Sequence, residues 1–210
     1  FDIRKEIGAT STMVTKYLLE AGYPITPRLA TALFYGIKTD TRDMGRDYSH
    51  EDLECYRLLF DLMDYRLLSD IENPDRDVEF FRIIHGAAES AVRYGNVGFT
   101  HLGNVPSPDY IAEMADFFQT MGKLEWMICS GVFKKSIFYS IRSKTISSAG
   151  VNAEKIAKSL GGSGGGHGKI GAGHIALDSS AANETLNRFI ETFKAVLRIT
   201  DTEPEKILEG

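Results

Sequence analysis

The stretch GGSGGGHGKIGAG, from Gly161 to Gly173, decides how the rest of this sequence is interpreted. Glycine in ordered structure costs about 0.5–1 kcal/mol relative to alanine, so such a density of glycine needs a physical reason. Close approach of a ligand is one, because successive N–H groups without side chains can converge on phosphate oxygens. His167 and Lys169 add side-chain donors at the same place. We therefore expect a loop that holds a phosphate-bearing ligand; a flexible linker is usually a plain Gly/Ser repeat.

Two common glycine motifs do not fit this stretch. A Walker-type phosphate loop would have glycine at Ser163 and a hydroxyl residue at Ile170. The pattern G-x-G-x-x-G does occur from Gly166 to Gly171, but we expect a helix before it and a strand after it. A dinucleotide-binding fold requires the reverse order. The match to that motif is therefore interpreted as accidental.

Composition limits the classes of function. The 210 residues are 43% hydrophobic and 25% charged, which is typical of globular domains. With 24 Lys and Arg against 29 Asp and Glu, the net charge is -5, so we expect no long duplex DNA as a partner. This composition is still compatible with a small nucleotide that is bound by a few cationic side chains.

Neither targeting signals nor the spacing of the cysteines indicates a specific function. No apolar run reaches the roughly 18 residues of a membrane span, so we expect no membrane partner. The first residues lack the architecture of a signal peptide, which favours a cytoplasmic protein. The chain starts without methionine and reads as part of a longer protein. Cys55 and Cys129 lie far apart, without the spacing of a metal site, and are expected to be reduced core residues.

Hydrophobic periodicity predicts a helical first part and a mixed second part, α+β overall. Capping signals and apolar spacing predict helices at 13–21, 29–37, 53–63 and 78–93, with a polar break at 70–77. Beyond the break we expect strands at 97–102, 126–132, 137–143 and 173–177, and helices at 108–121, 152–160 and 182–199.

Asp40 is a candidate metal ligand. It ends an apolar helix and lies between two hydroxyl residues, Thr39 and Thr41, and hard divalent cations prefer such oxygen ligands. The alternative is an ordinary solvated carboxylate at a helix end. Asp43 and Asp47 lie nearby without a recognised ligand spacing, and we expect them to be surface residues.

Arg142 and Ser143 end a predicted strand just before the helix that leads into the glycine stretch. An arginine there can bind phosphate through two hydrogen bonds, although a lone surface arginine is the alternative. His174, on the strand next to the glycines, is a weaker candidate. The other histidines outside the glycine stretch have no partners at ligand spacing and are expected to be structural or exposed: His50, His85 and His101.

Four segments taken together resemble the DHH phosphoesterase family, within its RecJ-like and exopolyphosphatase-related group. They are GATST at 8–12, GIKTDT at 36–41, SIRS at 140–143 and GGGH at 164–167. The resemblance covers nearly the whole chain. It implies an α/β class overall, with residues 1–72 as the helical C-terminal part of a DHH catalytic domain. Residues 73–93 would then form a connecting helix, and residues 94–205 a compact mixed-sheet α+β domain that binds substrate.

This resemblance implies a metal-dependent phosphohydrolase. Members use a pair of manganese or magnesium ions to activate water against a phosphate ester or anhydride. Asp40 matches the last metal-binding aspartate. The positions that match the substrate-gripping residues are Arg142, Ser143, Gly164, Gly165, Gly166 and His167.

In that family the Asp-x-Asp and Asp-His-His motifs lie upstream of the position of Gly8, and neither occurs before Gly8 in this sequence. We therefore expect a C-terminal portion of a longer enzyme that binds no metal by itself. The expected substrates are a small nucleotide or a short single-stranded oligonucleotide, and the expected assembly is a homodimer. The leading rival is a module that binds a nucleotide without cleaving it, and a weaker one is a purely architectural domain.

Overall fold

The computed structural model describes residues 7–45, 48–145, 148–178, 180–200 and 203–208. The chain divides into two compact units, Phe1–Asp75 and Arg76–Gly210. Each unit has its own hydrophobic core and is described by itself.

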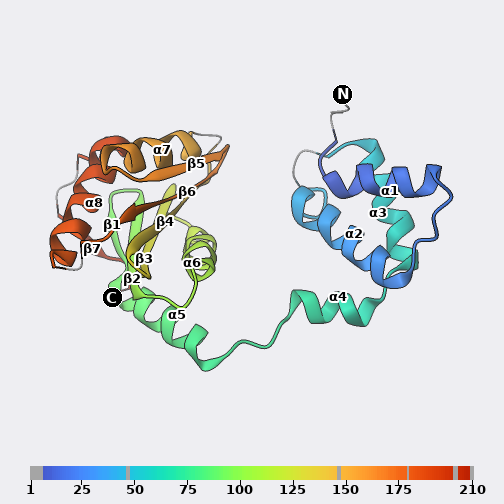
Figure 1. The fold of residues 1–210 in the computed structure, drawn as a ribbon, viewed down its shortest axis with the longest axis horizontal. Coiled ribbons are helices and arrows are strands. Elements are labelled where there is room, and N and C mark those ends of the chain that lie inside the picture. Colours follow the sequence, from blue (N-terminus) through green and yellow to red (C-terminus); the bar gives the residue numbers. More distant parts are fainter. Residues whose placement is uncertain (1–6, 46–47, 146–147, 179, 201–202, 209–210) are drawn as a thin grey trace. The chain divides into compact units, whose positions relative to one another are not determined.

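The first unit is helical (Figure 1). Its helices are α1 (Thr10–Glu20), α2 (Pro27–Thr41), α3 (His50–Leu62) and α4 (Tyr65–Glu72). Helix α3 begins with a capping box, in which Ser49 and Asp52 exchange side-chain and backbone hydrogen bonds. Helix α4 was not predicted, and the expected polar break at 70–77 is wrong over its first residues. The core of this unit contains buried Cys55 together with Phe34, Ile37 and Leu59.

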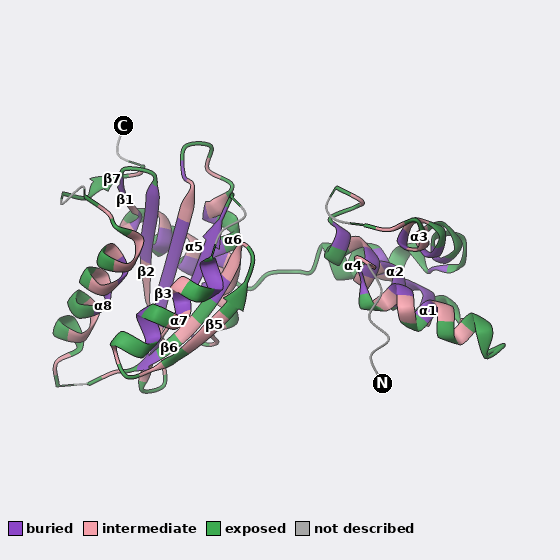
Figure 2. Cartoon of the chain, turned by 90° about the horizontal axis from the view of Figure 1, so that it is seen from above, coloured by how far each residue is buried: buried purple, intermediate pink, exposed green. Residues whose placement is uncertain are grey.

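The second unit is a seven-stranded mixed sheet between two pairs of helices (Figure 2). Its strands are β1 (Val92–Tyr94), β2 (Val97–Asn104), β3 (Trp126–Phe133), β4 (Ser136–Ser143), β5 (Ser163–His167), β6 (Ile170–Ala176) and β7 (Glu205–Lys206). They lie in the order β5-β6-β4-β3-β2-β1-β7, and the β2–β3 pair is parallel while the others are antiparallel. The helices are α5 (Val78–Ser90), α6 (Asp109–Gln119), α7 (Ala149–Ser159) and α8 (Ala182–Leu197). The expected α+β class is confirmed.

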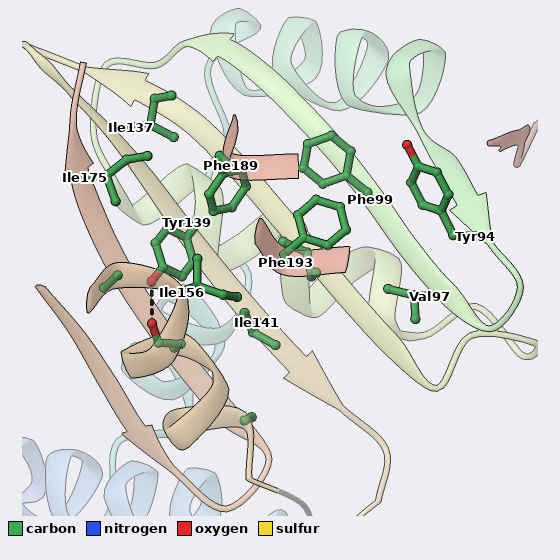
Figure 3. Packing of buried hydrophobic residues seen from close by; sticks show 14 residues of the cluster. Tyr94, Val97, Phe99, Ile137, Tyr139, Ile141, Ile156, Ile175, Phe189 and Phe193 are labelled. Atoms are coloured by element: carbon green, nitrogen blue, oxygen red, sulfur yellow. Dashed lines mark hydrogen bonds between the residues drawn. The ribbon is translucent and has the colours of Figure 1, made fainter. Parts of the chain in front are cut away.

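Both faces of the sheet carry a core. Phe189 and Phe193 of α8 pack with Phe99 and Tyr139 on one face, and the Tyr139 hydroxyl donates to the Ala153 carbonyl oxygen of α7 at 2.6 Å (Figure 3). On the other face α5 and α6 cover Met127 and buried Cys129. Helix α6 packs on β3 and β4, and the sheet continues beyond these strands into β6 and β5. No helix among the described residues is long and apolar enough to cross a membrane.

Candidate phosphate-binding site

The glycine-rich stretch forms a β-hairpin at the edge of the sheet. The strand expected at 173–177 is confirmed as the second half of β6, but the expected loop is wrong, because β5 pairs with β6 in antiparallel register from Ser163↔His174 to His167↔Ile170. The two-residue turn is Gly168-Lys169, and Gly168 has a positive φ of 52°, which glycine adopts without strain. Because β5 ends the strand order, its outward N–H and C=O groups have no partner strand among the described residues.

Packing against α7 explains several of the glycines. A Cβ on Gly150 of α7 would come within 2.2 Å of the Gly166 carbonyl oxygen. A Cβ on Gly171 would come within 2.3 Å of the Ala149 carbonyl oxygen, and Gly166 has a φ of 146°. The backbone of α7 therefore approaches the hairpin more closely than side chains would allow.

Gly165 is different from its neighbours. A Cβ at this position would meet no atom of the described residues within 4 Å, and the φ of Gly165 is not in the positive range. Neither helix packing nor backbone conformation requires glycine there. Open space above this residue is the feature that a bound ligand would explain.

The expected binding residues divide between the two faces of the sheet. Cross-strand register places Arg142, Ile170 and His167 in one row, on the face where α6 packs. Gly165 lies in the next row of that face, whereas Gly164 and Gly166 face α7. Ser143 follows Arg142 on β4 and so alternates to the opposite face, where its hydroxyl pairs with Thr145. The side chains of Arg142 and His167 thus share one face, about 10 Å apart across two strand spacings.

Arg142 is buried and already has an anionic partner. Its Nε and Nη2 donate to the two carboxylate oxygens of Asp116 on α6, at 2.6 and 2.9 Å, and its Nη1 donates to the Ser140 hydroxyl at 2.6 Å. Only 8% of Arg142 is exposed, whereas the Asp116 side chain is 61% exposed. A phosphate that binds Arg142 would have to replace or accommodate Asp116. No pattern in the sequence indicated Asp116, because this contact joins α6 to a residue of β4 that lies 26 positions away.

The cations of the hairpin are more accessible. His167 is exposed and Lys169 is half-buried, and no hydrogen bond or ion pair holds either side chain within the described part of the chain. His174 is exposed on the same face and stacks on Phe138, with ring centroids 5.3 Å apart. The hairpin therefore offers side-chain donors beside a backbone edge that no described strand pairs with, and such a surface can hold a phosphate group.

In the first unit the GIKTDT segment approaches the GATST segment at Gly36. A Cβ on Gly36 would come within 2.1 Å of the Ser11 hydroxyl oxygen, so glycine lets the start of α1 approach α2. Asp40 is exposed in the last turn of α2. The hydroxyls of Thr39 and Thr41 donate to carbonyls of their own helix and not to a common ligand. Among the described residues no group of three His, Cys, Asp or Glu could hold a metal ion.

The residues after the TDT segment carry backbone strain. Arg42, Asp43 and Met44 have φ of 49°, 53° and 62°, three successive left-handed residues that are not glycine. Asp43 is exposed as expected; it pairs with Lys38 and accepts a hydrogen bond from the Tyr56 hydroxyl. Asp47 lies outside the described residues. Nothing in the sequence predicted the strain.

Asp52 is a buried carboxylate that holds the GATST segment. It accepts hydrogen bonds from the backbone N–H of Gly8 at 2.8 Å and of Ala9 at 3.2 Å, and from the Thr12 hydroxyl at 2.5 Å. Burial by itself would raise the pKa of Asp52, but the hydrogen bonds from Thr12, Ser49 and Gly8 outweigh burial and lower it.

Comparisons with known proteins support the fold and leave the chemistry open. No protein-family model matches the chain. An uncharacterised protein, MJ1633, of Methanocaldococcus jannaschii is 32% identical over 195 residues, which are 90% of this chain and 40% of that protein. The chain thus spans less than half of this relative.

The crystal structure of an exopolyphosphatase-related protein from Bacteroides fragilis superimposes with a TM-score of 0.70 at 16% identity, over 92% of this chain and 59% of that one. A pGpG-specific phosphodiesterase from Vibrio cholerae matches 78% of this chain and 57% of its own at 14% identity, with a TM-score of only 0.38. The chain therefore has the fold of the Bacteroides protein over nearly all of its length.

Proposed function

We propose that this chain is part of a DHH-type phosphoesterase and that its second unit holds the phosphate of a nucleotide or short oligonucleotide substrate. The observation that carries the proposal is Gly165, whose missing side chain no packing contact explains, on the same sheet face as His167. The fold shared with an exopolyphosphatase-related protein supports it, and so does the order of the four resembling segments.

The role of the hairpin follows from its donors. Outward N–H groups of β5, the Lys169 ammonium and the His167 ring can hold phosphate oxygens and fix their orientation. Charge-assisted hydrogen bonds of this kind contribute about 1.5–3 kcal/mol each. This unit would therefore position the substrate, and the hydrolytic step would take place at a metal centre.

The residues of this chain do not fit such a metal centre by themselves. A pair of divalent cations needs several oxygen or nitrogen ligands, and Asp40 is one exposed carboxylate without a neighbouring group of ligands in the described residues. We propose that Asp40 contributes one ligand to a manganese or magnesium site whose other ligands lie outside these 210 residues.

A binding module that does not hydrolyse its ligand is the second candidate, since the donors of the hairpin can hold a phosphate without a metal ion. The two candidates differ in the longer protein supplied with manganese. For the phosphoesterase, Asp40→Asn lowers turnover of a nucleotide substrate by orders of magnitude, because a lost metal ligand removes electrostatic stabilisation of the reacting phosphate. If Asp40→Asn hydrolyses the substrate as fast as the wild type, Asp40 is not a metal ligand of the reaction. If the wild-type longer protein does not hydrolyse the nucleotide at all, the binding module is the correct candidate.

Calorimetric titration with adenosine 3′,5′-bisphosphate tests phosphate binding by the β5–β6 hairpin directly. His167→Ala and Lys169→Ala should each weaken binding about tenfold, which corresponds to the loss of one charge-assisted hydrogen bond. Lys135→Ala is the matched control, since Lys135 is an exposed lysine at the β3–β4 turn. Equal affinity of the wild type and the three variants would contradict a role of His167 and Lys169 in phosphate binding.

Arg142 needs a separate test, because its guanidinium group already forms an ion pair with Asp116. If Arg142 contacts the phosphate, Asp116→Asn should tighten binding several-fold, since a competing carboxylate is neutralised. Unchanged or weaker binding by Asp116→Asn would restrict Arg142 to the structural ion pair between β4 and α6.

A further inference from the structure

Helix α5 exposes apolar side chains on the side that faces away from the core. Its buried residues, Ile83 and Ala87, belong to the core on the α5 and α6 face of the sheet. A single exposed apolar residue is ordinary, but Val78 is 67% exposed and Phe81 58% exposed on one side of the same helix. The exposed residues of this outer face of α5 are Val78, Phe81, Arg82, His85, Gly86 and Glu89.

A cavity of about 350 Å³ lies at the C-terminal half of this outer face. It is lined by His85, Ala88 and Glu89 of α5 and by Lys206 and Leu208 of the C-terminal segment. That segment is held against α5 by the Lys206 ammonium, which donates to the Glu89 carbonyl oxygen at 2.6 Å. The side chains of Ala88 and Leu208 and the stem of Lys206 are apolar. The cavity can therefore take up an apolar side chain, with polar groups at the rim.

Gly86 lies in the middle of α5, where glycine is less favourable than alanine. A Cβ at Gly86 would meet no atom of the described residues within 4 Å, and the φ of Gly86 is not in the positive range. Neither the backbone conformation nor packing within the described part of the chain requires glycine at this position. The close approach of a second helix to the outer face would explain it.

The charges of the outer face complement those of a second copy of the same face. Arg82 and Glu89 lie about two helical turns apart, and their side chains are 72% and 71% exposed. Within α5 they form the exposed pairs Arg82–Glu79 and His85–Glu89, which are of a kind that contributes little to stability. If two copies of α5 pack antiparallel about a two-fold axis at His85, Arg82 of each copy lies opposite Glu89 of the other.

The same arrangement places Phe81 opposite the cavity of the other copy. A two-fold axis at His85 brings Phe81 level with Ala88 and Glu89 of the second helix. Both of these residues line the cavity, so the exposed ring of Phe81 can enter it. Gly86 lies next to the axis, where the two helices come closest. One geometry therefore accounts for the exposed ring, the cavity, the glycine and the two charges.

We propose that the outer face of α5 binds the same face of a second copy of this chain. The two helices pack antiparallel, Phe81 of each copy fills the cavity of the other, and Arg82 pairs with Glu89 across the interface. This surface lies on α5 and not on the β5–β6 hairpin, so the proposal does not depend on phosphate binding. A contact through one helix of 13 residues buries less than the roughly 800 Å² per partner of a standard interface, so the dimer dissociates on dilution.

Sedimentation velocity of the 210-residue chain over a range of concentrations measures this association. The wild type should shift from monomer to dimer as its concentration rises. Phe81→Ser should raise the dissociation constant about tenfold or more, because the ring no longer fills the cavity of the other copy. Phe117→Ser is the matched control and should leave the association unchanged, because Phe117 is a 54% exposed aromatic residue of α6.

Charge reversal tests the antiparallel geometry. Arg82→Glu alone and Glu89→Arg alone should each associate about tenfold or more weakly than the wild type, because like charges then meet at both contacts. An equimolar mixture of the two variants should form a heterodimer, since opposite charges again meet at both contacts. Association in the mixture also shows that both variants are folded.

Three results would each overturn the interface. They are a wild type that stays monomeric at every concentration, association that Phe81→Ser leaves unchanged, and a mixture of the two charge variants that associates no better than either variant alone. The second result would show that the copies associate through another surface of the chain. Thermal unfolding of Phe81→Ser at the wild-type temperature confirms that this variant is folded.

Discussion

Asp52 ties the start of α1 to the start of α3 through its two carboxylate oxygens. Its lowered pKa means that the folded state favours the ionised form. The resulting stability is present above the ordinary pKa of an aspartate, about 3.9, and is lost as the pH falls through the lower pKa of the folded state.

We predict that Asp52→Ala destabilises the first unit by about 2–3 kcal/mol, because buried donors lose their acceptor. Urea unfolding followed by circular dichroism at pH 7 measures this loss, and the difference from wild type should shrink toward pH 3. Asp61→Ala, at an exposed position of α3, is the control and should change little. A cost below about 0.5 kcal/mol at pH 7 would show that water replaces these hydrogen bonds.

His101 on β2 differs from Asp52, because folding favours its neutral form over its charged form. Burial lowers the pKa of His101, whose Nδ1 lies 2.9 Å from the Ser130 hydroxyl, so the folded state favours the neutral ring. As the pH falls below about 6.5, the unfolded chain binds a proton that the folded chain does not, and stability falls.

We predict that wild-type stability decreases between pH 7 and pH 5.5 by at most about 1.3 kcal/mol, the limit for one histidine whose unfolded pKa is about 6.5. In His101→Asn this part of the decrease should be absent. The measurement is urea unfolding of both proteins across that pH range, followed by the fluorescence of Trp126 in the same unit. Parallel pH profiles for the two proteins would exclude His101 as the cause.

At the scale of elements, the glycines where the hairpin packs on α7 are required by close backbone contact, whereas the neighbouring Gly165 is not. We predict that Gly166→Ala and Gly150→Ala each destabilise the second unit by about 2–4 kcal/mol, since the added carbon meets backbone atoms that cannot move away. Gly165→Ala should change stability by less than about 0.5 kcal/mol. Thermal unfolding of the three variants checks this order, and equal losses at Gly165 and Gly166 would contradict the assignment of faces.

The sequence predicted the longer elements well and the hairpin poorly. Apolar spacing located α6, β3 and β4, because each has enough buried residues to show its period. Strand β5 has no alternation and consists mostly of glycine, and its pairing with β6 and packing under α7 are tertiary effects. Strands β1 and β7 have too few residues for a pattern.

The candidate site was predictable only where chemistry is local. The concentration of glycine beside His167 and Lys169 is visible in the sequence. The Arg142–Asp116 pair and the stacking of Phe138 on His174 join residues from different elements, and their position depends on strand register. The predicted roles of Asp40 and Arg142 stay predictions until they are measured.

At the scale of the whole molecule, the central claim is that the second unit holds a phosphate on the face of Gly165 and His167. Gly165→Val tests it most directly, because a side chain there enters open space and touches no described atom of the protein within 4 Å at its Cβ. Calorimetry should show that this variant unfolds at the wild-type temperature but binds adenosine 3′,5′-bisphosphate at least tenfold more weakly than the wild type. Wild-type affinity in a normally folded Gly165→Val protein would contradict the claim.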